Sequence, residues 1–196
     1  VLKPFVMGIF EDITRTYEKL FRLQEHRLEL LEGGGDLISS QEKRYSKLRR
    51  ELVQLMANVH LNNGRIARLV DEIYTLYRRL VGLEGRLLRL AVTSGVARES
   101  FLNQYRGGEL NRRWLDRVRR LSGAGWRDFV RMHRAEIKEI RRSIAAIAGE
   151  VGLPISEFRR IVGQVRHGEH DARQAKEEMV KANVRLVFAI AKNYSN

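Results

Sequence analysis

Arginine gives this sequence of 196 residues its clearest capacity for binding, since 29 of the 37 basic residues are arginine. They are concentrated between residues 78 and 142, where 16 Arg and 1 Lys accompany 7 acidic residues. A guanidinium binds a phosphate or a carboxylate through paired N–H groups, so nucleic acid and an acidic protein surface are both open as partners. A solvated basic face without a partner is the third interpretation. The residues predicted to form a basic contact face are Arg112, Arg113, Arg119 and Arg120.

The last thirty residues hold a second group with binding chemistry. From Ala182 to Lys192 the predicted helix is apolar on nearly every side, and only Asn183, Arg185 and Lys192 are polar there. A helix that is apolar all round must be buried, so we expect this segment to dock on the rest of the protein or to belong to a larger one. An asparagine amide can read the edge of a base while an apolar neighbour covers the base face. An asparagine hydrogen-bonded within a helical core is the alternative.

The sequence shows no arrangement of catalytic or metal-binding residues. His167 and His170 are three residues apart, but no third ligand lies at metal-binding spacing. No phosphate loop, nucleophile elbow or pair of carboxylates in an apolar setting is present. We therefore expect a protein that is not an enzyme, with no cofactor, no metal and no small-molecule substrate.

Cysteine usage and hydropathy narrow the expected compartment. The absence of Cys excludes a disulfide framework and a thiolate metal site, and it fits a reducing cytoplasm. No apolar run is long enough to cross a bilayer, and no signal peptide is visible, so we expect a cytoplasmic protein without a membrane partner. The chain begins at Val1 without an initiator Met, which suggests a fragment.

The elements that must position these residues are predicted to be helices. The sequence has only 2 Pro and little β-branched alternation, which predicts an all-α fold. Gly33-Gly34-Gly35 predicts a flexible joint after the first helix. Apolar stripes at helical spacing predict helices over residues 4–32, 39–59, 66–91, 98–105, 109–121, 126–148, 154–166 and 167–196.

Several local features of these helices can be predicted. Ser39 and Glu42 have the spacing of a capping box. The short turn at 62–64 predicts that the helices before and after it form an antiparallel hairpin. Trp114 and Trp126 are predicted to anchor the core, since both lie on an apolar stripe; a base-stacking platform among the arginines is the alternative.

Residues 177–194 read E-E-M-V-K-A-N-V-R-L-V-F-A-I-A-K-N-Y and closely resemble the start of conserved region 2 of bacterial primary sigma factors of the seventy-kilodalton class. The family pattern there is K-E-M-V-x-A-N-L-R-L-V-x-x-I-A-K-x-Y. Residues 152–155 and the stretch beginning at Gly168 are similar to the family's run into that region. Residues 98–108 and the Trp126 helix are similar, more loosely, to the family's non-conserved insert.

The resemblance implies a multi-helix bundle with long antiparallel helices and four segments. Residues 1–32 would be the first helix of the insert or the tail of region 1.2, and residues 33–38 a joint or a deleted loop. Residues 39–166 would be the helical insert. Residues 167–196 would be the truncated first helix of region 2, called 2.1.

The resemblance also implies a function in transcription initiation and a cytoplasmic protein associated with the nucleoid. The partners would be core RNA polymerase, chiefly the β′ clamp helices, and the non-template strand of the minus-ten promoter element, which is recognised and melted. Asn183 and Leu186 would line a pocket for a flipped base, with Arg185 against that strand. Val184 and Val187 would belong to the core-polymerase-binding surface.

Two other functions are weighed against this one. Residues 155–188 could form the helix-turn-helix of an independent DNA-binding regulator. A helical scaffold could instead bind an acidic protein through its arginine-rich face.

Overall fold

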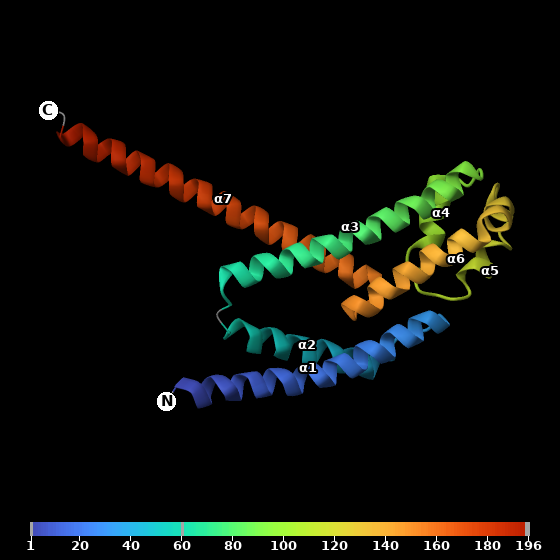
Figure 1. The fold of residues 1–196 in the computed structure, drawn as a ribbon, viewed down its shortest axis with the longest axis horizontal. Helices are drawn as coiled ribbons and strands as arrows, with labels where there is room; N and C mark the ends of the chain where they lie inside the picture. Colours follow the sequence, from blue (N-terminus) through green and yellow to red (C-terminus); the bar gives the residue numbers. More distant parts are fainter. Residues whose placement is uncertain (1, 60, 195–196) are drawn as a thin grey trace. The chain divides into compact units, whose positions relative to one another are not determined.

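The computed structural model describes the backbone of residues 2–59 and 61–194 and the side chains of residues 7–59 and 61–192. In those ranges every regular element is a helix, which confirms the all-α prediction (Figure 1). The chain divides into two compact units, Val1–Phe158 and Arg159–Asn196. The helices are α1 (Leu2–Gly33), α2 (Ser39–Ala57), α3 (Asn63–Thr93), α4 (Arg98–Tyr105), α5 (Trp114–Val118), α6 (Trp126–Val151) and α7 (Ile155–Tyr194).

Helices α1 and α2 form an antiparallel pair (Figure 1). Their buried contacts are Leu20 of α1 with Tyr45 and Leu48 of α2, and partly buried leucines pack around them. The chain reverses direction between the two helices at Gly34, whose φ of 89° favours glycine. The joint predicted at residues 33–35 is therefore a tight turn that closes a helix pair.

The start of α2 differs from the predicted capping box. The residue that precedes the helix is Ile38, and its N–H donates to Oε1 of Gln41 at 3.2 Å. The N–H of Glu42 donates to the carbonyl of Ile38 at 3.0 Å. The box predicted from Ser39 is wrong by one residue, because Ser39 already lies inside the helix.

Helix α3 begins at Asn63, inside the turn predicted at 62–64, and does not pack where the sequence predicts. The side chain of Asn62 accepts the N–H of Gly64 at 2.8 Å and so caps the helix. Beyond this turn, α3 packs on α6 and α4, whereas α2 packs on α1. The predicted hairpin of α2 with α3 is wrong, because α1 already covers the apolar side of α2 that contains Tyr45 and Leu48. The buried residues of α3 are Leu80, Leu87 and Ala91.

An aromatic cluster joins α4, α5 and α6. The Phe101 ring lies 6.1 Å from Trp114 and 6.3 Å from both Trp126 and Phe129, centroid to centroid. Both tryptophans are fully buried, and Nε1–H of Trp114 donates to the carbonyl of Gln104 at 2.7 Å. The core interpretation of the two tryptophans is therefore confirmed, and no ring face is left for stacking a base.

Two predicted helix boundaries are wrong. The helix predicted over residues 109–121 is only Trp114–Val118, because turns precede and follow it. The break predicted at His167-Gly168 is absent, since α7 runs through both residues. Gly168 has no atom within 4 Å of the position its Cβ would occupy, and a single exposed glycine costs a helix only about 1 kcal/mol.

Two loops meet through their main chains at Gly125 and Gly95. Gly125 precedes α6 with φ of 80°, and Gly95 follows α3 with φ of 90°. A Cβ on Gly125 would lie 2.4 Å from the carbonyl carbon of Gly95 and 2.5 Å from the carbonyl oxygen of Ser94. Both the space and the backbone conformation at position 125 therefore require glycine.

We expect Gly125→Ala to lower the free energy of unfolding by at least about 2 kcal/mol, because the methyl group meets main-chain atoms that cannot move away cheaply. Urea denaturation followed by tryptophan fluorescence measures the change. The matched control is Gly82→Ala in α3, where nothing lies within 4 Å of the Cβ position. That variant should gain about 0.5–1 kcal/mol, and equal destabilisation of both variants would contradict the account.

Candidate functional site

The five residues predicted to bind DNA and core polymerase lie on the second half of α7. All of their side chains are exposed, with Val187 at 65% and Val184 at 47%. Phe188, next to them, is 72% exposed. The segment therefore presents an apolar surface in the structure. The alternative of an Asn183 hydrogen-bonded within a core is wrong, because that side chain is exposed too.

Helical geometry divides these five residues between different sides of α7. At about 100° per residue, Leu186 lies roughly 60° from Asn183 and Val187 roughly 40° from it. Arg185 lies roughly 160° from Asn183, almost on the opposite side. The helix thus brings Asn183, Leu186 and Val187 together on an apolar face and places Arg185 elsewhere.

Arg185 belongs to a basic strip that the sequence reading missed. Lys181 precedes it by four residues and Lys192 follows it by seven, so all three exposed side chains share one side of α7. The signal was present in the sequence, since the helical period alone predicts this grouping. The strip gives the helix one apolar and one cationic side.

The predicted basic contact face lies on either side of the short helix α5. Trp114, Leu115 and Val118 fix one side of α5 in the core, and the four arginines are exposed. The guanidinium of Arg112 pairs with the carboxylate of Glu32 at the end of α1, and the main-chain N–H of Arg112 donates to the main-chain carbonyl of Glu32 at 3.0 Å. Within the described residues, the side chains of the other three make no ion pair: Arg113, Arg119 and Arg120.

A partly buried arginine of α6, Arg141, also missed from the sequence, holds the loop that contains Arg112. The Arg141 guanidinium lies 4.6 Å from the centroid of the Trp114 ring. Its Nη2 donates to the carbonyls of Asn111 at 2.7 Å and Gly108 at 3.1 Å. Burial lowers the pKa of Arg141 to about 10, so the side chain remains charged at neutral pH.

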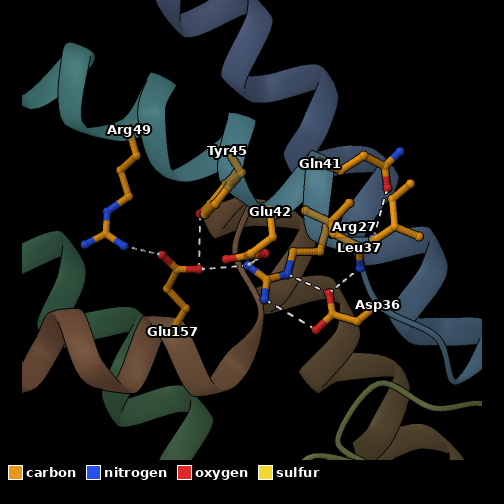
Figure 2. A network of polar contacts seen from close by, with 9 residues as sticks. Arg27, Asp36, Leu37, Gln41, Glu42, Tyr45, Arg49 and Glu157 are labelled. Atoms are coloured by element: carbon orange, nitrogen blue, oxygen red, sulfur yellow. Dashed lines mark hydrogen bonds and ion pairs between the residues drawn. The ribbon is translucent and has the colours of Figure 1, made fainter.

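A network of charged side chains fixes the first turn of α7 to α1 and α2 (Figure 2). Its centre is the carboxylate of Glu157, whose side chain is only 11% exposed. Oε1 accepts from Arg49 at 3.0 Å, and Oε2 accepts from the Tyr45 hydroxyl at 3.1 Å and from Arg27 at 3.5 Å. Burial and the neighbouring Glu157 charge both raise the pKa of Tyr45, so its hydroxyl stays a donor.

Arg27 extends this network to the turn between α1 and α2. Its Nε donates to Oδ1 of Asp36 at 2.9 Å, and the same oxygen accepts the N–H of Leu37 at 2.8 Å. Burial raises the pKa of Asp36, but these hydrogen bonds and the Arg27 charge lower it more, so the net pKa lies below 3.8. The stability that Asp36 contributes is therefore present above about pH 4 and is lost as pH falls through the lower folded pKa.

The described side chains contain no group of three His, Cys, Asp or Glu residues placed to hold a metal ion. None of the helices in the described ranges is both long and apolar enough to cross a membrane.

The family described as the non-essential region of sigma-70 matches residues 1–148, and the chain belongs to this family. A relative is the RNA polymerase sigma factor RpoD of Neisseria gonorrhoeae, which is 24% identical over 197 residues. The match covers 100% of this chain and 29% of that protein, so the chain spans less than a third of the relative's length.

These comparisons confirm the resemblance to primary sigma factors. The family match covers residues 1–148, which the sequence reading likened only loosely to the insert. The segment that carried the closest resemblance, residues 177–194, lies beyond that match and within the alignment to the relative.

We expect Glu157→Gln to lower the free energy of unfolding by about 1.5–3 kcal/mol, because two arginines lose a shared, nearly buried carboxylate. Thermal and urea denaturation followed by circular dichroism measure the loss.

Glu150→Gln is the matched control, since Glu150 pairs with Arg79 at 3.4 Å and both side chains are more than half exposed. It should cost less than about 0.5 kcal/mol. Equal small losses in both variants would show that the network contributes no more than a surface ion pair.

Proposed function

We propose that this chain is part of the sigma subunit of a bacterial RNA polymerase, a transcription initiation factor that binds core polymerase and helps to recognise and melt the minus-ten promoter element. The observation that carries the proposal is the sigma-70 family match over residues 1–148. The region-2-like sequence of residues 177–194 supports it. The proposed role is one of binding and assembly and includes no catalytic step.

Residues 167–196 are proposed to be the first helix of region 2, and the residues before them the helical insert with its leading helix. The continuous helix α7 is compatible with this division, because a region boundary of the sequence can fall within one helix. The boundary proposed at residue 167 separates two regions of the family's sequence and is not the start of a helix, since α7 begins at Ile155.

The two sides of α7 suggest separate roles in binding a single strand. Asn183 and Leu186 share a face, so an amide and an apolar side chain can hold one flipped base together. Arg185 lies on the other side with Lys181 and Lys192, so it cannot touch the same base and is proposed to contact strand phosphates. Val184 and Val187 are proposed to support the core-polymerase-binding surface, chiefly toward the β′ clamp helices.

The two rival functions fare differently. A helix-turn-helix over residues 155–188 is wrong, because this segment is one uninterrupted helix without the required turn. A scaffold that binds an acidic protein remains compatible with the exposed Arg113, Arg119 and Arg120. In the sigma reading the basic contact face, with Arg112, is proposed to touch the β′ subunit.

The base-pocket proposal predicts a specific effect of Asn183→Ala. In the presence of core polymerase, fluorescence anisotropy should show binding of a labelled non-template minus-ten oligonucleotide, weakened by about tenfold in the variant. Gln174→Ala removes an exposed amide from the same helix and should have little effect.

The outcomes separate the functions. Equal losses in both variants would remove the base-pocket role. Steeply salt-dependent binding of duplex DNA by the chain alone would favour an independent DNA-binding protein. Binding of neither DNA nor polymerase would favour the scaffold.

The basic contact face predicts a second result. Arg119→Glu with Arg120→Glu should reduce retention of the β′ subunit in a pull-down by about tenfold, because guanidinium groups become repulsive carboxylates. Arg65→Glu with Arg68→Glu changes the charge equally on exposed positions of α3 and is the control. Unchanged retention of the β′ subunit after the first pair of substitutions would contradict the proposed β′ contact.

A further inference from the structure

A cavity of about 580 Å³ lies between α6, the end of α1 and the loop that leads into α5. Its size is within the range of small-molecule and peptide side-chain pockets. Five basic and three acidic residues line it, together with three apolar ones. The lining residues are Glu32, Glu109, Leu110, Arg112, Leu115, Asp116, Arg134, Lys138, Arg141, Arg142 and Ala145.

The α6 wall of this cavity contains two cations without a partner. Arg134 and Lys138 are four residues apart, so they project from the same side of the helix, and both are exposed. Neither makes an ion pair or side-chain hydrogen bond with any residue in the described part of the chain. Arg142 continues the row but pairs with Glu139.

Arg141 adds a recessed positive charge to the same wall. Its Nη2 is used by the carbonyls of Gly108 and Asn111, but its buried Nη1 has no acceptor among the described residues. The Trp114 ring under the guanidinium is a weaker compensation than a hydrogen-bonded carboxylate. The inner wall therefore keeps an uncompensated donor next to Arg134 and Lys138.

The remaining lining residues favour one kind of anionic ligand over another. Leu110, Leu115 and Ala145 supply apolar surface that a phosphate backbone would not cover. Asp116 and the buried Glu109 would repel a continuous row of phosphates. A peptide in which carboxylates alternate with apolar side chains can satisfy both the cations and the apolar surface, and can avoid these acids.

We propose that this cavity binds an acidic and apolar peptide segment of a partner protein. The peptide's carboxylates pair with Arg134 and Lys138, and an apolar side chain between them packs on Leu110, Leu115 and Ala145. Only Arg112 is shared with the basic contact face, so the proposal does not depend on a β′ contact or on the region 2 assignment.

The test uses the full chain and a fluorescein-labelled peptide of alternating Glu and Leu with blocked ends. Fluorescence anisotropy should show saturable binding, and a Gln-Leu peptide of equal length should bind at least about tenfold more weakly. Arg134→Glu with Lys138→Glu should lower the affinity for the Glu-Leu peptide by about tenfold. Circular dichroism checks that each variant is folded.

Arg65→Glu with Arg68→Glu on α3 is the control of equal charge, and it should change peptide affinity less than about twofold. Equal weakening by both pairs would mean nonspecific attraction and would overturn the proposal. So would no weakening by the cavity variant, or a short DNA duplex that binds more tightly than the peptide and is released by the cavity variant alone.

Discussion

The nearly buried carboxylate of Glu157 is the constraint on which the arrangement of the first unit depends. It receives Arg27 from α1 and Tyr45 and Arg49 from α2, across 108 to 130 residues of sequence. The buried apolar cluster between α1 and α2 is small, with Leu20, Tyr45 and Leu48 at its centre. Charged contacts, including Arg112 with Glu32, also tie this helix pair to the remainder of the unit. Removing Glu157 leaves the largely covered Arg27 guanidinium without this partner, which is why the Glu157 contacts matter more than surface ion pairs.

Periodicity predicted the helices well, because an apolar stripe is a property of one segment and its solvent. Periodicity could not predict which apolar stripes pack against each other. The sequence predicted that α2 packs on α3, but α1 covers the apolar stripe of α2, and α3 packs on α6 and α4. The Ser39 and Gly168 predictions failed for another reason: each relied on a local preference worth about 1 kcal/mol, which is too small to fix a helix boundary by itself.

The candidate residues show a similar division. The residue types in the terminal segment allowed candidate binding residues to be predicted, and the separation of Arg185 from Asn183 follows from the helical period. The role of Arg141 was not readable, since it depends on a tryptophan 27 positions away and on two loop carbonyls. The cavity beside it joins residues 32 to 145, a set that becomes neighbours only in the folded chain.

The aromatic cluster also determines which parts of this protein tryptophan fluorescence can report on. The chain contains 2 tryptophans, Trp114 and Trp126, and their rings lie 6.5 Å apart in one buried cluster. Tryptophan fluorescence, excited selectively at wavelengths that tyrosine does not absorb, therefore senses only the junction of α4, α5 and α6. Detachment of α1 and α2, or fraying of α7, would leave the emission almost unchanged while helical signal is lost. A fluorescence melt and a circular dichroism melt that do not coincide would thus reveal the order in which parts of the chain come apart.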